Sequence, residues 1–389
     1  MRSPITWRFS LRRAPRTGLA LALTGLCLLA IAPAADDAGA APRSPVGSPP
    51  SAVTAARVLA GMTLPEKIGQ LFMVPTGGSA LNEYVTSLHI GGLLLFGSDA
   101  ATFAQGHALV QTAQNAAKIP LLISTDQEGG GVAQMSNGGG VTRLPTARQY
   151  GFTGTPAQVY QDALFVGRQL KALGVNMDLA PVLDVERNAY SADGSRSYGA
   201  DPALVARLGL AAIQGYQAAG VAATAKHFLG LGEIAGDLHQ SLPVVRLSLA
   251  DLNRYDLVPI RAAIAGGVDA LMVTHAPITA LDPTNTPASL SRPIVTGFIR
   301  GTLGYRGLIV TDSLAMGGLT VKEPSNEQAC VRALEAGSDM ALISSDRQVI
   351  RASVAAVAKA VATGRLSLAT VNAAVLHVLT LKATLGLLH

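Results

Sequence analysis

Eight short apolar runs, separated by longer stretches with helical spacing of apolar residues, constrain the fold of this chain more than any other sequence feature. Each run has the length of a strand and is apolar throughout, without alternating polar residues. Strands of this kind are buried on both faces, as in parallel sheets that are covered by helices. The runs cover residues 70–74, 92–96, 120–126, 175–183, 221–227, 270–275, 307–312 and 340–343.

The segments between the runs read as helices. Residues 202–220 and 249–266, for example, place apolar side chains at helical spacing and end in glycine. Eight strand–helix units predict an α/β fold, a single (β/α)8 barrel of the TIM type, with a doubly wound open sheet as the alternative. A length of 389 residues with 49% hydrophobic content can fill a core of that size. Only one further helix is expected after the eighth run, over 367–387, so no C-terminal α/β sandwich domain is predicted.

The N-terminal part has a different character. Residues 1–35 resemble a secretory signal peptide, since a basic segment precedes a short apolar stretch and small residues. That stretch is short for a membrane span, and Leu26 directly before Cys27 disfavours a lipoprotein site. Residues 36–54 are rich in Ala, Pro and Ser and predict a flexible linker, which leaves 55–389 for the barrel. The mature chain is therefore expected to be secreted or associated with the cell envelope, without a stable membrane span.

The net charge of +5 carries little information about partners. Part of it belongs to the predicted signal segment, in Arg2, Arg8, Arg12, Arg13 and Arg16. The remaining chain has no basic stripe with interleaved aromatic residues, no zinc-type Cys/His spacing and no phosphate-binding GxxxxGK[ST] motif. No nucleic acid partner is predicted, and the chain is expected to be a monomer.

Charged residues gather where the predicted strands end. These positions are Asp126, Asp184, Arg196, Lys226, His227, His275 and Asp312. Each has a structural explanation by itself, such as a helix cap for the first two aspartates. Together they predict one pocket, because the C-terminal rim of a barrel carries the active site.

The segment after the fifth run adds a second polar pair. Three glycines, Gly230, Gly232 and Gly236, separate Lys226–His227 from an Asp-x-His sequence at Asp237 and His239. Two residues apart in an extended loop, these side chains face the same side, where a carboxylate can orient an imidazole. A satisfied Lys–His pair followed by a surface turn is the alternative explanation.

Several separated motifs, taken together, resemble glycoside hydrolase family 3, and within it the single-domain β-N-acetylhexosaminidases of peptidoglycan turnover. The similarity begins near residue 54 and extends to the C-terminus. The motifs, in the family's order, are MTLPEKIGQL at 62–71, GGLLLF at 91–96, DQEGG at 126–130, RSYG at 196–199, KHF at 226–228, DLH at 237–239, PASLS at 287–291 and TDSL at 311–314.

The resemblance implies a role for each polar group. Asp312 matches the nucleophile that forms a covalent glycosyl-enzyme, and His239, assisted by Asp237, matches the acid/base. The ligands of the sugar hydroxyls match Asp126, Arg196, Lys226 and His227. No metal or cofactor is required. The implied activity is that of a secreted retaining exo-β-N-acetylglucosaminidase acting on peptidoglycan fragments or other β-linked N-acetylglucosamine glycans.

The chain also departs from the family pattern. Gly131 and Gln134 stand where arginines are usual, Leu229-Gly230-Leu231-Gly232 replaces Pro-Gly-His-Gly, and Leu238 replaces a serine. A pocket with fewer polar contacts can accept a different sugar. A β-glucosidase-like enzyme, a phosphorolytic enzyme and a sugar-binding protein that has lost turnover therefore remain as alternatives.

Overall fold

The computed structural model describes residues 49–188, 191, 194–235, 241–323, 325–343 and 346–389. Eight parallel strands lie in the order β10-β1-β2-β3-β6-β7-β8-β9. They are β1 Phe72–Pro75, β2 Gly92–Leu95, β3 Leu122–Thr125, β6 Met177–Asp178, β7 Ala222–Phe228, β8 Ala270–Val273, β9 Leu308–Thr311 and β10 Ala341–Leu342. A parallel bridge between Val310 and Met340 joins β9 to the chain entering β10, so the sheet closes on itself. The predicted barrel is confirmed, and the open sheet is excluded.

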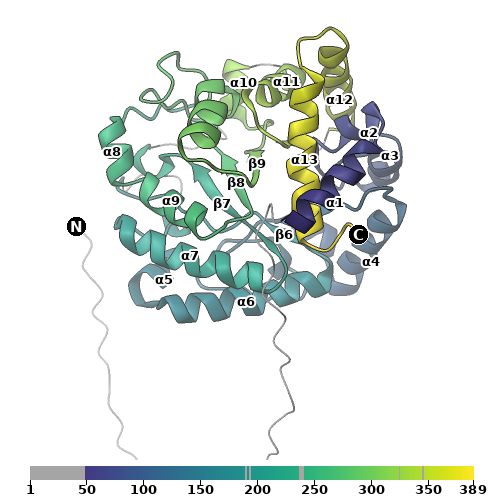
Figure 1. Cartoon of the computed structure of the whole chain (residues 1–389). Helices are drawn as coiled ribbons and strands as arrows, with labels where there is room; N and C mark the ends of the chain where they lie inside the picture. Colours follow the sequence, from purple (N-terminus) through teal and green to yellow (C-terminus); the bar gives the residue numbers. More distant parts are fainter. Residues whose placement is uncertain (1–48, 189–190, 192–193, 236–240, 324, 344–345) are drawn as a thin grey trace, which may run out of the picture. The chain divides into compact units, whose positions relative to one another are not determined.

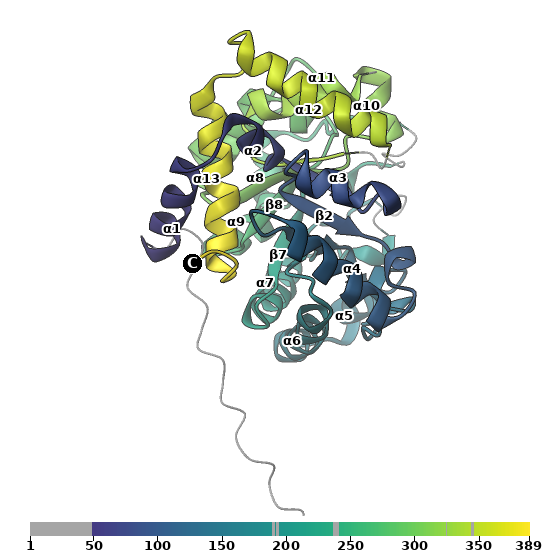
Figure 2. The same ribbon diagram turned by 90° about the vertical axis from the view of Figure 1, so that its right-hand side faces the viewer.

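Helices surround the barrel and fill the connections between strands (Figures 1 and 2). They are α1 Pro49–Ala60, α2 Leu64–Gly69, α3 Leu81–Thr86, α4 Phe103–Ala116, α5 Ala147–Thr153, α6 Pro156–Leu173, α7 Pro202–Ala218, α8 Leu249–Arg254, α9 Leu257–Ala265, α10 Gly317–Lys322, α11 Asn326–Ala336, α12 Arg347–Ala362 and α13 Leu368–Thr384. The segment 249–266, predicted as one helix, forms two, because the backbone of Tyr255 leaves the helical region. A short hairpin, β4 Gln127–Gly129 and β5 Val132–Ala133, follows β3.

The predicted linker ends earlier than expected. Helix α1 begins at Pro49, inside the segment 36–54, and lies beside α13 in Figures 1 and 2. Its residue Ala55 is fully buried, and Val58 and Leu59 pack against the core, so burial of an apolar face stabilises this helix. No helix among the described residues combines the length and the apolar character that crossing a membrane requires.

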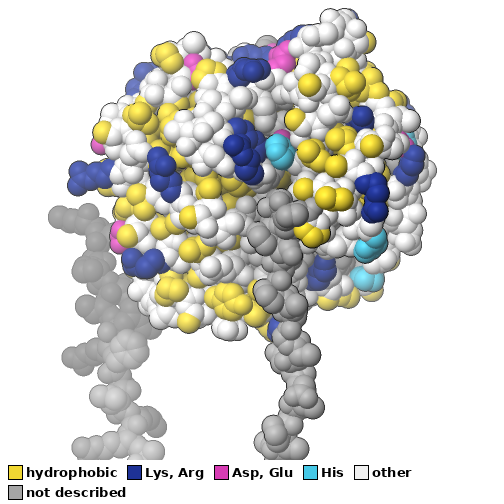
Figure 3. Space-filling view, viewed as in Figure 1, with side chains coloured by type: hydrophobic (Ala, Val, Ile, Leu, Met, Phe, Trp, Pro, Cys, Tyr) yellow, Lys and Arg dark blue, Asp and Glu magenta, His cyan; other side chains and the backbone are white. Residues whose placement is uncertain are grey.

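Figure 3 shows how charged and apolar side chains of the described residues are distributed over one face of the molecule. There the Lys and Arg side chains of the described residues are separated by apolar and neutral groups and form no continuous basic stripe.

The strand side chains form two apolar clusters, one inside the barrel and one between the strands and the helices, because successive strand residues point in opposite directions. In β2, Leu94 belongs to the cluster inside the barrel, whereas Leu93 and Leu95 belong to the cluster between strands and helices. Helix α13 contributes Val378 and Leu381 to the interior cluster. The barrel is a packed core, so the polar groups at its strand ends lie on a rigid support.

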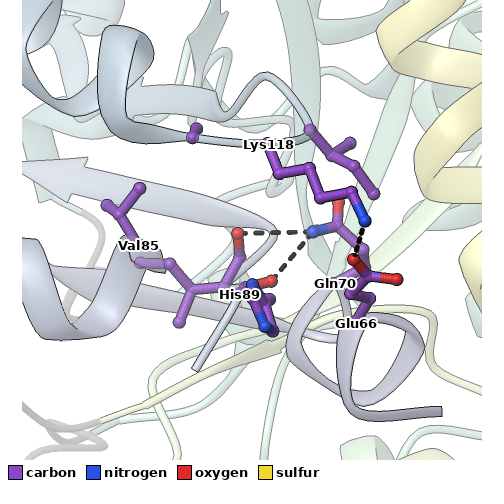
Figure 4. Close-up of a pocket in the computed structure, with 8 residues that line it drawn as sticks. Glu66, Gln70, Val85, His89 and Lys118 are labelled. Carbon is purple, nitrogen blue, oxygen red and sulfur yellow. Dashed lines mark hydrogen bonds and ion pairs between the residues drawn. The ribbon is translucent and has the colours of Figure 1, made fainter. Parts of the chain in front are cut away.

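One cation is enclosed in this core away from the strand ends. The Lys382 side chain of α13 is fully buried, and its Nζ donates to Gln70 Oε1 at 2.5 Å. Figure 4 shows the small pocket beside Gln70, where the Gln70 amide donates to the His89 carbonyl at 2.9 Å and Lys118 pairs with Glu66. Burial lowers the pKa of Lys382 to about 7.

We expect Lys382→Met to stabilise the protein. The folded-state pKa lies below the unfolded value of about 10.4, so this lysine makes stability fall as the pH decreases from about 10 to 7, with no further loss below. A thioether of similar length removes that cost, and the free energy of unfolding at pH 7 should rise by about 1–4 kcal/mol. Urea unfolding at several pH values measures it. A wild-type pH slope between 7 and 10 that persists unchanged in the variant would contradict this prediction.

Candidate active site

Four charged side chains form one network where β3 and β7 end. Lys226, the fifth residue of β7, donates from Nζ to Asp126 Oδ1 and pairs with Glu128 Oε1, both at 2.7 Å. Arg196 contacts both oxygens of Glu128, Nε to Oε2 and Nη2 to Oε1, each at 2.7 Å. Two carboxylates and two cations therefore balance one another, as buried charges require.

The electrostatics of the network follow from that pairing. Burial opposes ionisation of Glu128, but Lys226 and Arg196 outweigh it and lower the pKa of this carboxyl to about 2. Burial likewise opposes the charge of Lys226, and Asp126 and Glu128 outweigh it, so the pKa of Lys226 is raised. Glu128 and Lys226 therefore both keep their charge at neutral pH, which suits groups that hold a ligand and excludes Glu128 as a proton donor there.

His227 and Asp312 form the second part of the site. His227 Nδ1 lies 2.7 Å from Asp184 Oδ2, and the backbone N–H of His227 donates to the same oxygen at 3.2 Å. Burial disfavours the imidazolium, yet the Asp184 carboxylate raises the pKa of His227. Because Asp184 occupies Nδ1, the Nε2 edge of the ring is the one left for a ligand.

Asp312 directly follows β9. Its backbone N–H donates to the Val273 carbonyl at 2.9 Å, and its Oδ1 accepts from the Ser313 N–H at 2.7 Å. Burial raises the pKa of this carboxyl, but the fields of His227 and His275 and the Ser313 hydrogen bond together lower it. His275 itself is held by Ser289 Oγ at 2.7 Å and the Ser313 carbonyl at 2.8 Å. Asp312 is thus an ionised, half-buried carboxylate on a rigid strand end.

The strand order places the charged network and Asp312 on opposite sides of the barrel mouth. Around the closed barrel, β3 and β9 are four strands apart in either direction. Asp126, just after β3, therefore lies across the barrel mouth from Asp312, with Lys226 and His227 of β7 between them. A ligand between the two ends would be fixed by the charged network and would face the Asp312 carboxylate.

The two other predicted catalytic residues, Asp237 and His239, lie outside the described residues. The structure does describe the chain that leads to them. Arg187 N and Asn188 N donate to the Gly232 carbonyl at 3.0 and 3.1 Å, and Asn188 Nδ2 donates to the Glu233 carbonyl at 2.9 Å. A side chain at Gly232 would come within 2.3 Å of the Val185 carbonyl. The loops after β6 and β7 are consequently packed together up to residue 235.

Comparison with protein families identifies the family of this chain. Residues 63–381 match the glycosyl hydrolase family 3 N-terminal domain. The chain belongs to glycosyl hydrolase family 3.

Three members illustrate the range of similarity to this family 3 chain. A β-N-acetylglucosaminidase/β-glucosidase of Cellulomonas fimi is 34% identical over 346 residues, which are 85% of this chain and 59% of that protein. A solved β-N-acetylglucosaminidase of Paenibacillus has 39% identity and a TM-score of 0.81, covering 84% of this chain and 63% of the other. The chain thus spans less than two thirds of these two relatives. The crystal structure of a Beutenbergia cavernae β-N-acetylhexosaminidase has 34% identity and a TM-score of 0.76, and the match covers 83% of this chain and 99% of the other.

Two residues of this family 3 site were not among those singled out as ligands from the sequence. Glu128 joins Lys226 to Arg196, and Asp184 holds His227. The signal for Glu128 was its place two residues after Asp126, which puts both on one side of an extended chain. Asp184 was noticed only as a strand-end residue that could cap a helix, and it pairs with the imidazole instead.

Two of the departures from the family pattern, Gln134 and Gly131, have different structural consequences. Gln134 Oε1 accepts the N–H of Gly97 at 3.1 Å, so its side chain joins the loops after β2 and β3. A Cβ at Gly131 would have no atom within 4 Å, so this position leaves open space beside the network.

Proposed function

We propose that this protein is a retaining exo-β-N-acetylglucosaminidase that acts on peptidoglycan fragments or other β-linked N-acetylglucosamine glycans. The observation that carries the proposal is the ionised Asp312 carboxylate facing the Asp126–Lys226–Glu128–Arg196 network across the barrel mouth. The names of the three relatives support N-acetylglucosamine as the sugar, since each names a β-N-acetylglucosaminidase or a β-N-acetylhexosaminidase.

In this mechanism the network and His227 hydrogen-bond the sugar hydroxyls and hold the anomeric carbon against Asp312. A carboxylate oxygen of Asp312 attacks that carbon from one face while the glycosidic bond breaks on the other. His239 gives its proton to the departing oxygen, and Asp237 supports the imidazolium. The neutral imidazole then takes a proton from water, which attacks the same carbon and releases Asp312 and a sugar of unchanged configuration.

Hydrolysis of aryl glycosides tests the proposal. Release of 4-nitrophenol from the β-N-acetylglucosaminide should exceed release from the β-glucoside, and it should be independent of phosphate. A faster β-glucoside reaction would favour the β-glucosidase alternative, and a phosphate requirement would favour phosphorolysis. Glycan binding by calorimetry without hydrolysis of either glycoside would overturn the proposal in favour of a sugar-binding protein.

We also propose export of the chain, on the pattern of residues 1–35, which lie outside the described residues. Expression of the full sequence in a bacterial host, followed by N-terminal sequencing of the mature protein, measures cleavage. Recovery of an uncleaved cytoplasmic chain alone would contradict it.

Arg187 is expected to position the segment that carries the proposed acid/base. Its Nη2 lies 3.2 Å from Asp256 Oδ2 and 3.3 Å from Glu233 Oε2, and its guanidinium lies 4.1 Å from the centre of the Tyr255 ring. Burial raises the pKa of Asp256 to about 7, and Arg187 opposes that rise. The side chain thereby ties the chain before Asp237 to the turn between α8 and α9.

We predict that Arg187→Ala impairs proton donation more than nucleophilic attack. For a substrate with a poor leaving group, kcat/KM should fall by about 10–100-fold, which is less than the roughly 10²–10⁴-fold that a general acid/base supplies, because Arg187 acts through another residue. For a 2,4-dinitrophenyl glycoside, whose leaving group needs no proton, the loss should be smaller. Arg187→Lys should recover part of the activity, and Arg365→Ala, which removes an exposed Arg–Glu pair, serves as the control. An equal loss of kcat/KM with both substrates would show that Arg187 has a structural role only and does not act on proton donation.

A further inference from the structure

A cavity of about 330 Å³ adjoins the charged network on the side formed by the connections after β3 and β6. Its walls come from the β4–β5 hairpin, the start of α5 and the turn before Arg196, and include Glu128, Gly129, Gly131, Thr146, Gly194 and Arg196. The volume is in the range of small-molecule sites. It shares Glu128 and Arg196 with the proposed sugar site, so the two spaces adjoin at this ion pair.

The chain around the cavity is fixed by hydrogen bonds. Arg148 donates from Nη2 to the Gly194 carbonyl at 3.2 Å and from Nε to the Ser197 carbonyl at 3.4 Å, and it also pairs with Glu186. On the opposite wall the Gly130 N–H donates to the Leu144 carbonyl at 2.9 Å. Walls held in this way need little further ordering when a ligand binds, which lowers the entropic cost of binding.

The chemistry of the described walls favours an uncharged ligand. Among the described residues, the charged side chains that line the cavity are Glu128 and Arg196, which pair in a two-pronged contact. The remaining lining is small, with a threonine and a serine hydroxyl and the backbone of glycines. Such a surface can hydrogen-bond a neutral polyhydroxyl group, whereas a carboxylate would gain no free cation.

The position of the cavity identifies which part of a substrate would reach it. In the proposed mechanism the anomeric carbon lies at Asp312, and the opposite end of the ring reaches the network across the barrel. A cavity beyond Glu128 and Arg196 therefore lies on the non-reducing side of the bound sugar. We propose that it is a subsite for one additional neutral sugar unit, so that the enzyme releases disaccharides as well as monosaccharides. This inference rests on the proposed function.

The test uses 4-nitrophenyl β-N-acetylglucosaminide and 4-nitrophenyl β-N,N′-diacetylchitobioside, with products identified by mass spectrometry. With a working subsite, nitrophenol and intact disaccharide appear together from the chitobioside without a lag. If the wild type cleaves the monosaccharide substrate but yields only monosaccharide from the chitobioside, with a lag before nitrophenol, the subsite is wrong and the proposed function stands. Cleavage of neither substrate overturns the proposed function and this inference with it.

Two variants at one position connect the product pattern to the cavity. Gly131 has open space around its Cβ and no left-handed backbone, so Gly131→Arg and Gly131→Met can extend into the cavity. Both should lower the ratio of disaccharide to monosaccharide release by about tenfold or more, the order expected when a pocket is filled. If Gly131→Arg lowers the ratio and Gly131→Met does not, the positive charge rather than the filled volume causes the change. Gly61→Arg, at an exposed position after α1, is the control and should leave the ratio unchanged. An unchanged ratio in both Gly131 variants would overturn the assignment of the cavity.

Discussion

Replacing Asp312 by asparagine should lower kcat by a factor on the order of 10⁴ or more, as expected when the nucleophile of a covalent mechanism is lost. An amide oxygen cannot form the glycosyl-enzyme, while its size preserves the packing around the strand end. The Ser313 N–H can still donate to the amide oxygen in place of Asp312 Oδ1, so the fold should be retained. Initial rates on 4-nitrophenyl β-N-acetylglucosaminide, with circular dichroism to confirm folding, measure the effect.

A smaller variant separates the nucleophile from a general electrostatic role. In Asp312→Gly the lost side chain leaves room for azide, which attacks the anomeric carbon directly and should yield the glycosyl azide of inverted configuration. Restored nitrophenol release together with that product supports the assignment. Wild-type rates in Asp312→Asn would eliminate Asp312 as the nucleophile.

Replacing Lys226 by methionine should both destabilise the protein and reduce sugar binding. Lys226 contacts both Asp126 and Glu128, and its side chain is 2% exposed. Without it Glu128 loses one of its two described cationic partners and keeps Arg196, and breaking a buried pair typically costs about 3–5 kcal/mol. The loss of a charged hydrogen bond to a hydroxyl removes about 1.5–3 kcal/mol of binding, or about 10–150-fold in kcat/KM. Urea unfolding and initial rates measure the two effects.

A double variant distinguishes charge balance from loss of packing. Glu128→Gln added to Lys226→Met removes one excess negative charge, and it should recover part of the unfolding free energy without restoring kcat/KM. The pH dependence supplies a second test. Since the pKa of Glu128 is lowered to about 2, its contribution to stability is present above about pH 4 and is lost as the pH falls towards 2. A stability equal to wild type in Lys226→Met would show that the network is not structurally important.

Much of the barrel could be predicted because its signals are local in the sequence. The run at 92–96 contains β2, and the run at 307–312 contains β9, since strands buried on both faces must be apolar throughout. The boundaries were less accurate. The run at 175–183 contains only the two-residue strand β6, because its later residues bend toward β7 and make an isolated bridge at Val182. Helix α1 was missed from Pro49 to Thr54 because its stability comes from packing against α13, which is more than 300 residues away.

By itself, the sequence determined which residue types stand at the strand ends and that they belong to one rim. It could not determine how those residues pair. The sequence assigned no role to Glu128, and its contacts with Lys226 and Arg196 make it a fixed anion. The opposition of Asp126 and Asp312, and the open cavity at Gly131, likewise depend on closure of the barrel. Local patterns encode the elements, whereas charge pairing and cavities arise from contacts between residues far apart in the chain.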